Sequence, residues 1–97
     1  MTFDAVLSNT AEAFLASLDP VDRQAFYQAL DVLLQDPYPD GVSKVLLTFF
    51  PYRPGTLGFA HGDFWITYVI LNSATIGIAS VYWRPDSPRR GGELLEI

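Results

Sequence analysis

Apolar residues recur with helical spacing in the first part of the chain. Phe14, Leu15 and Leu18 follow Ala11 at intervals of three, four and seven residues, so one face of this stretch is apolar. Asn9 or Thr10 opens the helix, and Glu12 stands three residues after Asn9, as in a capping box. The pattern therefore predicts a first helix that ends before residue 19.

A second helical stripe follows directly. Asp19 is a capping residue, and Pro20 suits the first helical position because its missing N–H is not needed there. Apolar residues then repeat at helical spacing as far as Leu34. The pair Asp36-Pro37 ends the helix, since a residue before proline avoids the helical region. Residues 36–41 are a predicted loop.

The remaining apolar stretches have the length and composition of strands. Gly62 and Asp63 separate two of them and predict a hairpin turn. Their apolar residues occupy both faces, as expected for a sheet that helices cover on one side. We expect an α+β two-layer sandwich with a mainly antiparallel sheet, summarised as β-α-α-β-β-β. The predicted strands are residues 2–8, 44–50, 56–61, 64–71 and 75–83.

The length and composition of the chain narrow the class of protein. Ninety-seven residues predict one domain, which we place at residues 1–84, followed by a polar tail at residues 85–97. The absence of cysteine and the single histidine exclude thiol chemistry and a multi-histidine metal site, and we expect no cofactor. No apolar run approaches the roughly 20 residues of a membrane span, and no signal peptide is evident. We expect a soluble cytoplasmic protein.

The net charge of −5 is unevenly distributed. Residues 1–40 hold seven acidic residues against one basic residue, whereas residues 41–97 hold five basic residues against four acidic ones. Because nucleic-acid binding depends mainly on cation–phosphate contacts, we expect weak direct binding to nucleic acid. Any such surface would lie in the second half of the chain.

Three segments together resemble the RelE/ParE superfamily of bacterial type II toxins. They are FLASLDPVDRQAFYQALDVLLQDPYPDG, YRPGTLGFAHGDFWITYVI and IGIASVYWR. The family pattern is a helical hairpin ending in a "dP" loop, a strand, a strand with Gly-Asp-aromatic-Arg and a tyrosine, and a last strand ending at a basic residue. The resemblance covers roughly residues 3–84 and implies a RelE/ParE-like fold.

The resemblance implies two kinds of activity. RelE-type members are ribosome-dependent mRNA endonucleases whose basic residues stabilise the charge on the phosphate, without a metal. ParE-like members inhibit DNA gyrase instead, and a cognate antitoxin neutralises both kinds. The expected partners are thus an antitoxin and either the ribosome or DNA gyrase.

The sequence departs from the ribonuclease pattern at three positions. Trp65 stands where the family motif has arginine, and Thr56 and Gly58 stand roughly where lysines occur on the preceding strand. No tyrosine follows Tyr82 to serve as a C-terminal acid, whereas Arg84 matches the family's terminal basic residue. These differences favour a ParE-like or catalytically weakened toxin. The alternatives are an active RelE-type endonuclease and a non-toxic partner-binding or dimerisation module.

If the chain is an endonuclease, its candidate catalytic residues are Arg84, Arg53 and His61. Arg84 matches the family position, and Arg53 lies in the connector Pro51–Gly55. His61 is the only side chain whose ordinary pKa lies near neutrality. The structural alternatives are a solvated strand end, a salt bridge to the acidic helices and a solvated turn, respectively.

The candidate partner-binding residues are aromatic or basic. Trp65 is either packed core or a partner-facing aromatic on the open face of the sheet, since both faces of its strand are apolar. Lys44 is also a candidate for a strand-edge charge that prevents pairing. The full set is Trp65, Tyr82, Arg89, Arg90 and Lys44.

Overall fold

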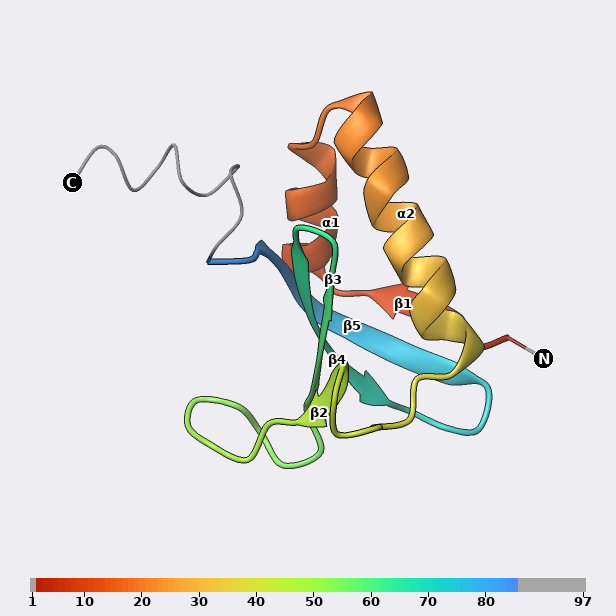
Figure 1. Ribbon diagram of the computed structural model, residues 1–97, viewed down its shortest axis with the longest axis vertical. Helices are drawn as coiled ribbons and strands as arrows, with labels where there is room; N and C mark the ends of the chain where they lie inside the picture. Colours follow the sequence, from red (N-terminus) through yellow and green to blue (C-terminus); the bar gives the residue numbers. More distant parts are fainter. Residues whose placement is uncertain (1, 86–97) are drawn as a thin grey trace.

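The computed structural model describes residues 2–85. Two helices stand together over a twisted five-stranded sheet, as Figure 1 shows. The predicted α+β architecture is therefore confirmed. The elements are β1 (Asp4–Leu7), α1 (Asn9–Ala16), α2 (Pro20–Gln35), β2 (Lys44–Leu46), β3 (Leu57–His61), β4 (Phe64–Ile70) and β5 (Thr75–Trp83).

The sheet has the strand order β1-β5-β4-β3-β2. Only β1 and β5 are parallel, while β5, β4, β3 and β2 pair antiparallel in succession. Each strand lies within a segment that the sequence predicted to be extended, so the summary β-α-α-β-β-β was one strand short. β2 is one edge of the sheet and β1 the other, and β4 lies at its centre.

Capping side chains set the starts of both helices. Ser8, not Asn9, caps α1, because its hydroxyl accepts the Ala11 N–H at 3.1 Å. Asp19 caps α2 as predicted, accepting the Asp22 N–H at 2.8 Å, and Pro20 is the first helical residue. α2 ends at Gln35, next to Asp36-Pro37. The second helix therefore begins and ends where its sequence signals predicted.

Aromatic rings join the helices to the sheet. Phe64 of β4 contacts Phe26 of α2 edge-on, with ring centroids 5.7 Å apart, and stacks on Trp83 of β5 at 5.1 Å. Phe14 of α1 contacts the same Trp83 at 5.5 Å. Aliphatic side chains of the same helices and strands complete this core. The core therefore lies between the helices and one face of the sheet.

Strand β2 is shorter than the predicted segment 44–50. Only Lys44–Leu46 pair with β3, which itself begins at Leu57. Residues 47–56 form a loop, and Phe49 and Phe50 within it are 61% and 93% exposed. A run of apolar residues predicted a buried strand here, but no strand or helix within residues 2–85 covers the two phenylalanines.

One buried hydroxyl ties the centre of the sheet to the loop after α2. Tyr68 of β4 is fully buried, and its Oη donates to the Pro37 carbonyl oxygen at 2.6 Å. Burial, followed by the negative charges of Asp40 and Asp36, raises the pKa of Tyr68 above its ordinary value. The bond holds the loop at residues 36–43 against the end of β4.

No helix among residues 2–85 is long and apolar enough to span a membrane.

Tyr68→Phe should destabilise the protein by about 1–3 kcal/mol, because it leaves the buried Pro37 carbonyl without its donor. Urea unfolding at pH 7 measures this loss. Tyr27→Phe is the matched control, since Tyr27 is 49% exposed. An equal effect of both substitutions would contradict the role of the bond.

Alkaline pH should weaken the wild-type fold through the same residue. Because the pKa of Tyr68 is raised in the folded state, the unfolded chain loses its proton first as pH rises past about 10. The unfolded state then binds fewer protons than the folded state, so the free energy of unfolding falls as pH rises. Tyr68→Phe should show a smaller fall between pH 9 and 11 by urea unfolding, and an unchanged slope would contradict it.

Candidate functional site

The two faces of β4 have different surroundings. Successive side chains of a strand point to opposite faces. Phe64, Ile66 and Tyr68 face the helices and are at most 3% exposed. Trp65 and Thr67 therefore point to the other side of the sheet, which we call the open face. The structure thus places Trp65 outside the helix-packed core.

The Trp65 indole lies directly over Gly58 of β3. A Cβ atom at position 58 would lie 2.5 Å from Trp65 Cζ2, and 3.3 Å from Leu47 Cδ1. The first separation is far shorter than a van der Waals contact, so only glycine leaves room for the ring at this position. Trp65 is half-buried as a result. The ring covers part of the open face and remains partly exposed.

Two hydroxyl groups lie beside the tryptophan. Thr67 of β4 and Ser80 of β5 are register partners, and their side-chain oxygens form a short hydrogen bond. Both residues are buried. The next register pair on this face is Trp65 with Tyr82, and Tyr82 is 49% exposed. The open face therefore changes from buried hydroxyls to exposed aromatic surface along β4 and β5.

Among residues 2–85, no charged side chain belongs to this part of the open face. Gly58 and Ala60 of β3 face Thr67 and Trp65 in register, and Val45 of β2 faces Gly58. Hydroxyl, indole and aliphatic groups can bind an apolar surface and donate single hydrogen bonds. They cannot supply the positive charge that phosphate chemistry requires.

Arg84 lies at the end of β5, against the turn between β3 and β4. Its backbone N–H donates to the Asp63 carbonyl at 2.7 Å, and its Nη1 donates to the Gly62 carbonyl at 3.2 Å. Gly62 has a φ of +58°, which glycine adopts without strain and which the tight turn requires. Arg84 therefore fastens the last strand to the hairpin turn.

His61 is near this turn but on the helix side of the sheet. Its ring stacks on Phe59, with centroids 5.6 Å apart. Together with Asp22, Gln28 and Trp83 it lines a cavity of about 190 Å³ beside α2. His61 and Trp65 thus lie on opposite sides of the sheet.

Arg53 lies in the loop that precedes β3, beyond the other end of that strand. It is exposed, and no ion pair involves it among residues 2–85. His61 is at the opposite end of β3, a strand of five residues that is roughly 13 Å long at about 3.3 Å per residue. The structure brings Arg84 close to the turn that follows His61, and leaves Arg53 apart from both.

Lys44 is held by the loop that precedes it. Its Nζ donates to the Asp36 carbonyl at 2.7 Å and lies 3.9 Å from Asp40 Oδ2. Asp40 accepts the Lys44, Val42 and Ser43 N–H groups and the Ser43 hydroxyl. These hydrogen bonds, with the Lys44 N–H the largest contribution, hold the pKa of Asp40 well below its ordinary value. Arg89 and Arg90 lie outside the described residues.

Sequence reasoning missed two features of this region. The Thr67–Ser80 pair depends on a register shift between Thr67 and Tyr68, for which the sequence has no marker. The exposed Phe49 and Phe50 were assigned to a strand, although Pro51 directly after them was a signal of a loop. Residues 2–85 contain no group of three or more side chains suited to a metal ion.

Solved structures with a similar fold are toxins. A chain of the toxin–antitoxin complex RelBE2 from Mycobacterium tuberculosis matches with a TM-score of 0.70 and 22% identity, over 87% of this chain and 100% of that one. The chain has the fold of the RelE-type toxins. Neither the family models nor the curated proteins that we compared gave a match.

Two further structures agree with this RelE-like fold. The archaeal RelE–RelB complex from Pyrococcus horikoshii OT3 matches with a TM-score of 0.64 and 20% identity, over 90% of this chain and 100% of that one. The YoeB dimer from Staphylococcus aureus matches with a TM-score of 0.62 and 13% identity, over 87% and 99% of the two chains. The fold expected from the resemblance is therefore confirmed.

Gly58→Ala should destabilise the protein by about 1–3 kcal/mol, because the added methyl group overlaps the Trp65 ring. Urea unfolding measures the loss, and a red shift of tryptophan emission reports the displaced indole. Gly77→Ala in β5 is the matched control, since a Cβ there comes no closer than 3.4 Å to a neighbour. The double variant Gly58→Ala/Trp65→Ala should lose less than the sum of the two single variants.

Similar losses for Gly58→Ala and Gly77→Ala, or strictly additive losses in the double variant, would contradict the contact between Trp65 and Gly58.

Proposed function

We propose that this protein is the toxin of a type II toxin–antitoxin pair, of the ParE-like or catalytically weakened kind. It acts by binding a macromolecular target, either the ribosome or DNA gyrase, and a cognate antitoxin neutralises it. The RelE-like fold supports the class of protein. The position of Trp65 over Gly58 on the open face carries the choice of binding over cleavage.

The argument from Trp65 is electrostatic. Cleavage of RNA adds negative charge to the phosphate in the transition state, and cations placed nearby stabilise that charge. The family resemblance puts an arginine at position 65 and lysines near positions 56 and 58 in the ribonucleases. Here an indole occupies that place, beside glycine and a threonine that is 7% exposed. A neutral aromatic surface of this kind favours contact with a protein target, because tryptophan and tyrosine dominate binding energy at protein interfaces.

The structural neighbours also support an antitoxin as a partner. The structures from M. tuberculosis and P. horikoshii are both complexes of toxin with antitoxin. Each similar chain is covered over its whole length by this chain. This similarity of the backbone over the whole chain supports an antitoxin as a partner here.

A RelE-type endonuclease that uses Arg84, Arg53 and His61 is the second candidate. The placement of Arg84 beside the turn after His61 favours it. Against it, His61 faces the cavity beside α2, and Arg53 lies beyond the far end of β3. The three side chains would have to move together before they could contact one phosphate.

Induced expression without an antitoxin should stop growth of a bacterial host and leave ribosome-bound mRNA uncut. Tyr82→Ala should restore growth, because loss of a central interface aromatic costs about 2 kcal/mol, or roughly 30-fold in affinity. Tyr27→Ala on α2 is the matched control, since both tyrosines are 49% exposed. Growth curves and primer extension on ribosome-bound mRNA are the measurements.

Each other outcome of that experiment rejects part of the proposal. Cleavage of ribosome-bound mRNA that is lost in the Arg84→Ala variant would establish the endonuclease instead. Normal growth on induction of the wild type would reject a toxin of either kind and leave the non-toxic binding module.

A further inference from the structure

Large apolar side chains gather on the surface around β2, at one edge of the sheet. Val42, Leu46, Phe49 and Phe50 are 88%, 52%, 61% and 93% exposed. We call these four residues, together with the loop 47–56, the β2 surface. Figure 1 shows that this loop projects from the sheet next to β2. Exposed apolar groups gathered in this way are typical of a protein-binding surface.

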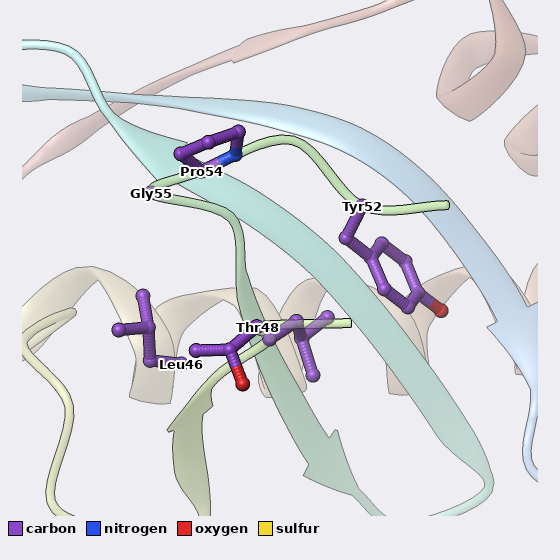
Figure 2. Close-up of a pocket in the computed structure, with 6 residues that line it drawn as sticks. Leu46, Thr48, Tyr52, Pro54 and Gly55 are labelled. Atoms are coloured by element: carbon purple, nitrogen blue, oxygen red, sulfur yellow. The ribbon is translucent and has the colours of Figure 1, made fainter. Parts of the chain in front are cut away.

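The β2 surface contains a cavity of about 230 Å³. Figure 2 shows Leu46 and Thr48 on one side of it, across from Tyr52 and Pro54 of the loop. The Tyr52 ring is braced edge-on by Phe49, with centroids 5.3 Å apart. Pockets for drug-sized ligands have roughly 300–1,000 Å³, so this smaller cavity suits a single large apolar side chain.

Within residues 2–85, the backbone of β2 leaves one residue open for pairing with a further strand. Ser43 and Leu47 bond to β3 through the Ala60 N–H and the Thr56 carbonyl. In an antiparallel ladder, residues that hydrogen-bond to the neighbouring strand alternate with residues whose N–H and C=O point away from it. Lys44 and Leu46 are of the second kind, so their backbone groups point away from the sheet. The Asp40–Gly41 loop already binds both outward groups of Lys44. Leu46, next to the cavity, is therefore the point where an extended peptide can add to this edge.

The charge of this region is opposite to that of the rest of the chain. Residues 41–62 contain Lys44 and Arg53 but no acidic residue, although the whole chain carries −5. Arg53 is exposed within the β2 surface, and Lys44 already faces Asp40. The β2 surface therefore attracts acidic groups at its rim.

We propose that the β2 surface binds an extended segment of a partner protein in which a large apolar residue is flanked by acidic residues. The apolar side chain enters the cavity, the backbone bonds to Leu46, and a carboxylate faces Arg53. The proposal does not depend on the toxin function, because it rests on β2 and the loop 47–56 and not on Trp65 or Tyr82.

Two synthetic ten-residue peptides test the proposal. They share a central Leu-Phe-Leu, and one carries glutamate and the other lysine on both sides. With the full-length protein, fluorescence anisotropy should show binding of the glutamate peptide and at least roughly threefold weaker binding of the lysine peptide. Amide chemical shifts should change around Leu46 and Tyr52 and not on α2. Arg53→Glu should reverse the preference between the peptides.

Phe50→Ser should weaken binding of the glutamate peptide by roughly fivefold or more, without loss of fold, because Phe50 is 93% exposed. Val21→Ser on α2 is the matched control, as Val21 is 74% exposed. Equal affinity for both peptides, no binding of either, or shifts confined to the open face would overturn the proposal. Self-association of the wild type that Phe50→Ser abolishes would assign the surface to a second copy and overturn it as well.

Discussion

The packing of the two helices on the inner face of β4 and β5 is the interaction on which the rest of the structure depends. Phe64 lies at its centre, between Phe26 of α2 and Trp83 of β5. Because strand side chains alternate, burying Phe64 and Tyr68 under the helices also turns Trp65 to the opposite side. The core therefore decides which residues the protein presents on its open face.

The centre of the open face is consequently separate from the basic side chains of Lys44 and Arg84. The centre of the sheet offers an indole, two buried hydroxyls and an exposed tyrosine. The cations lie at its margins, where Arg84 bonds to the hairpin turn and Lys44 to the loop after α2. The hydrogen bonds of these two residues stabilise the fold, and the neutral centre of the sheet remains available for contact with another molecule. The RelE-like backbone therefore presents a neutral surface at the centre of its sheet.

Much of this was predictable from the sequence, and the failures have physical causes. The signals at Asp19-Pro20 and Asp36-Pro37 located α2 because caps and prolines act locally. The face of the sheet to which Trp65 points was not predictable. Both faces of β4 are apolar, and only packing with helices distant in the sequence selects one of them. The end of β2 was misjudged because pairing stops where β3 begins, at Leu57, and not where the apolar run stops. The resemblance located the fold, but it could not show that His61 and Trp65 lie on opposite sides of the sheet.

The contact between Trp65 and Gly58 also restricts how this sequence can change over generations. A side chain at position 58 has to displace the indole, because even a Cβ atom would overlap the ring. A lysine on β3 is therefore accommodated at least cost when a smaller residue replaces Trp65. Substitutions at the two positions are thus coupled, and the effect of one on stability depends on the residue present at the other.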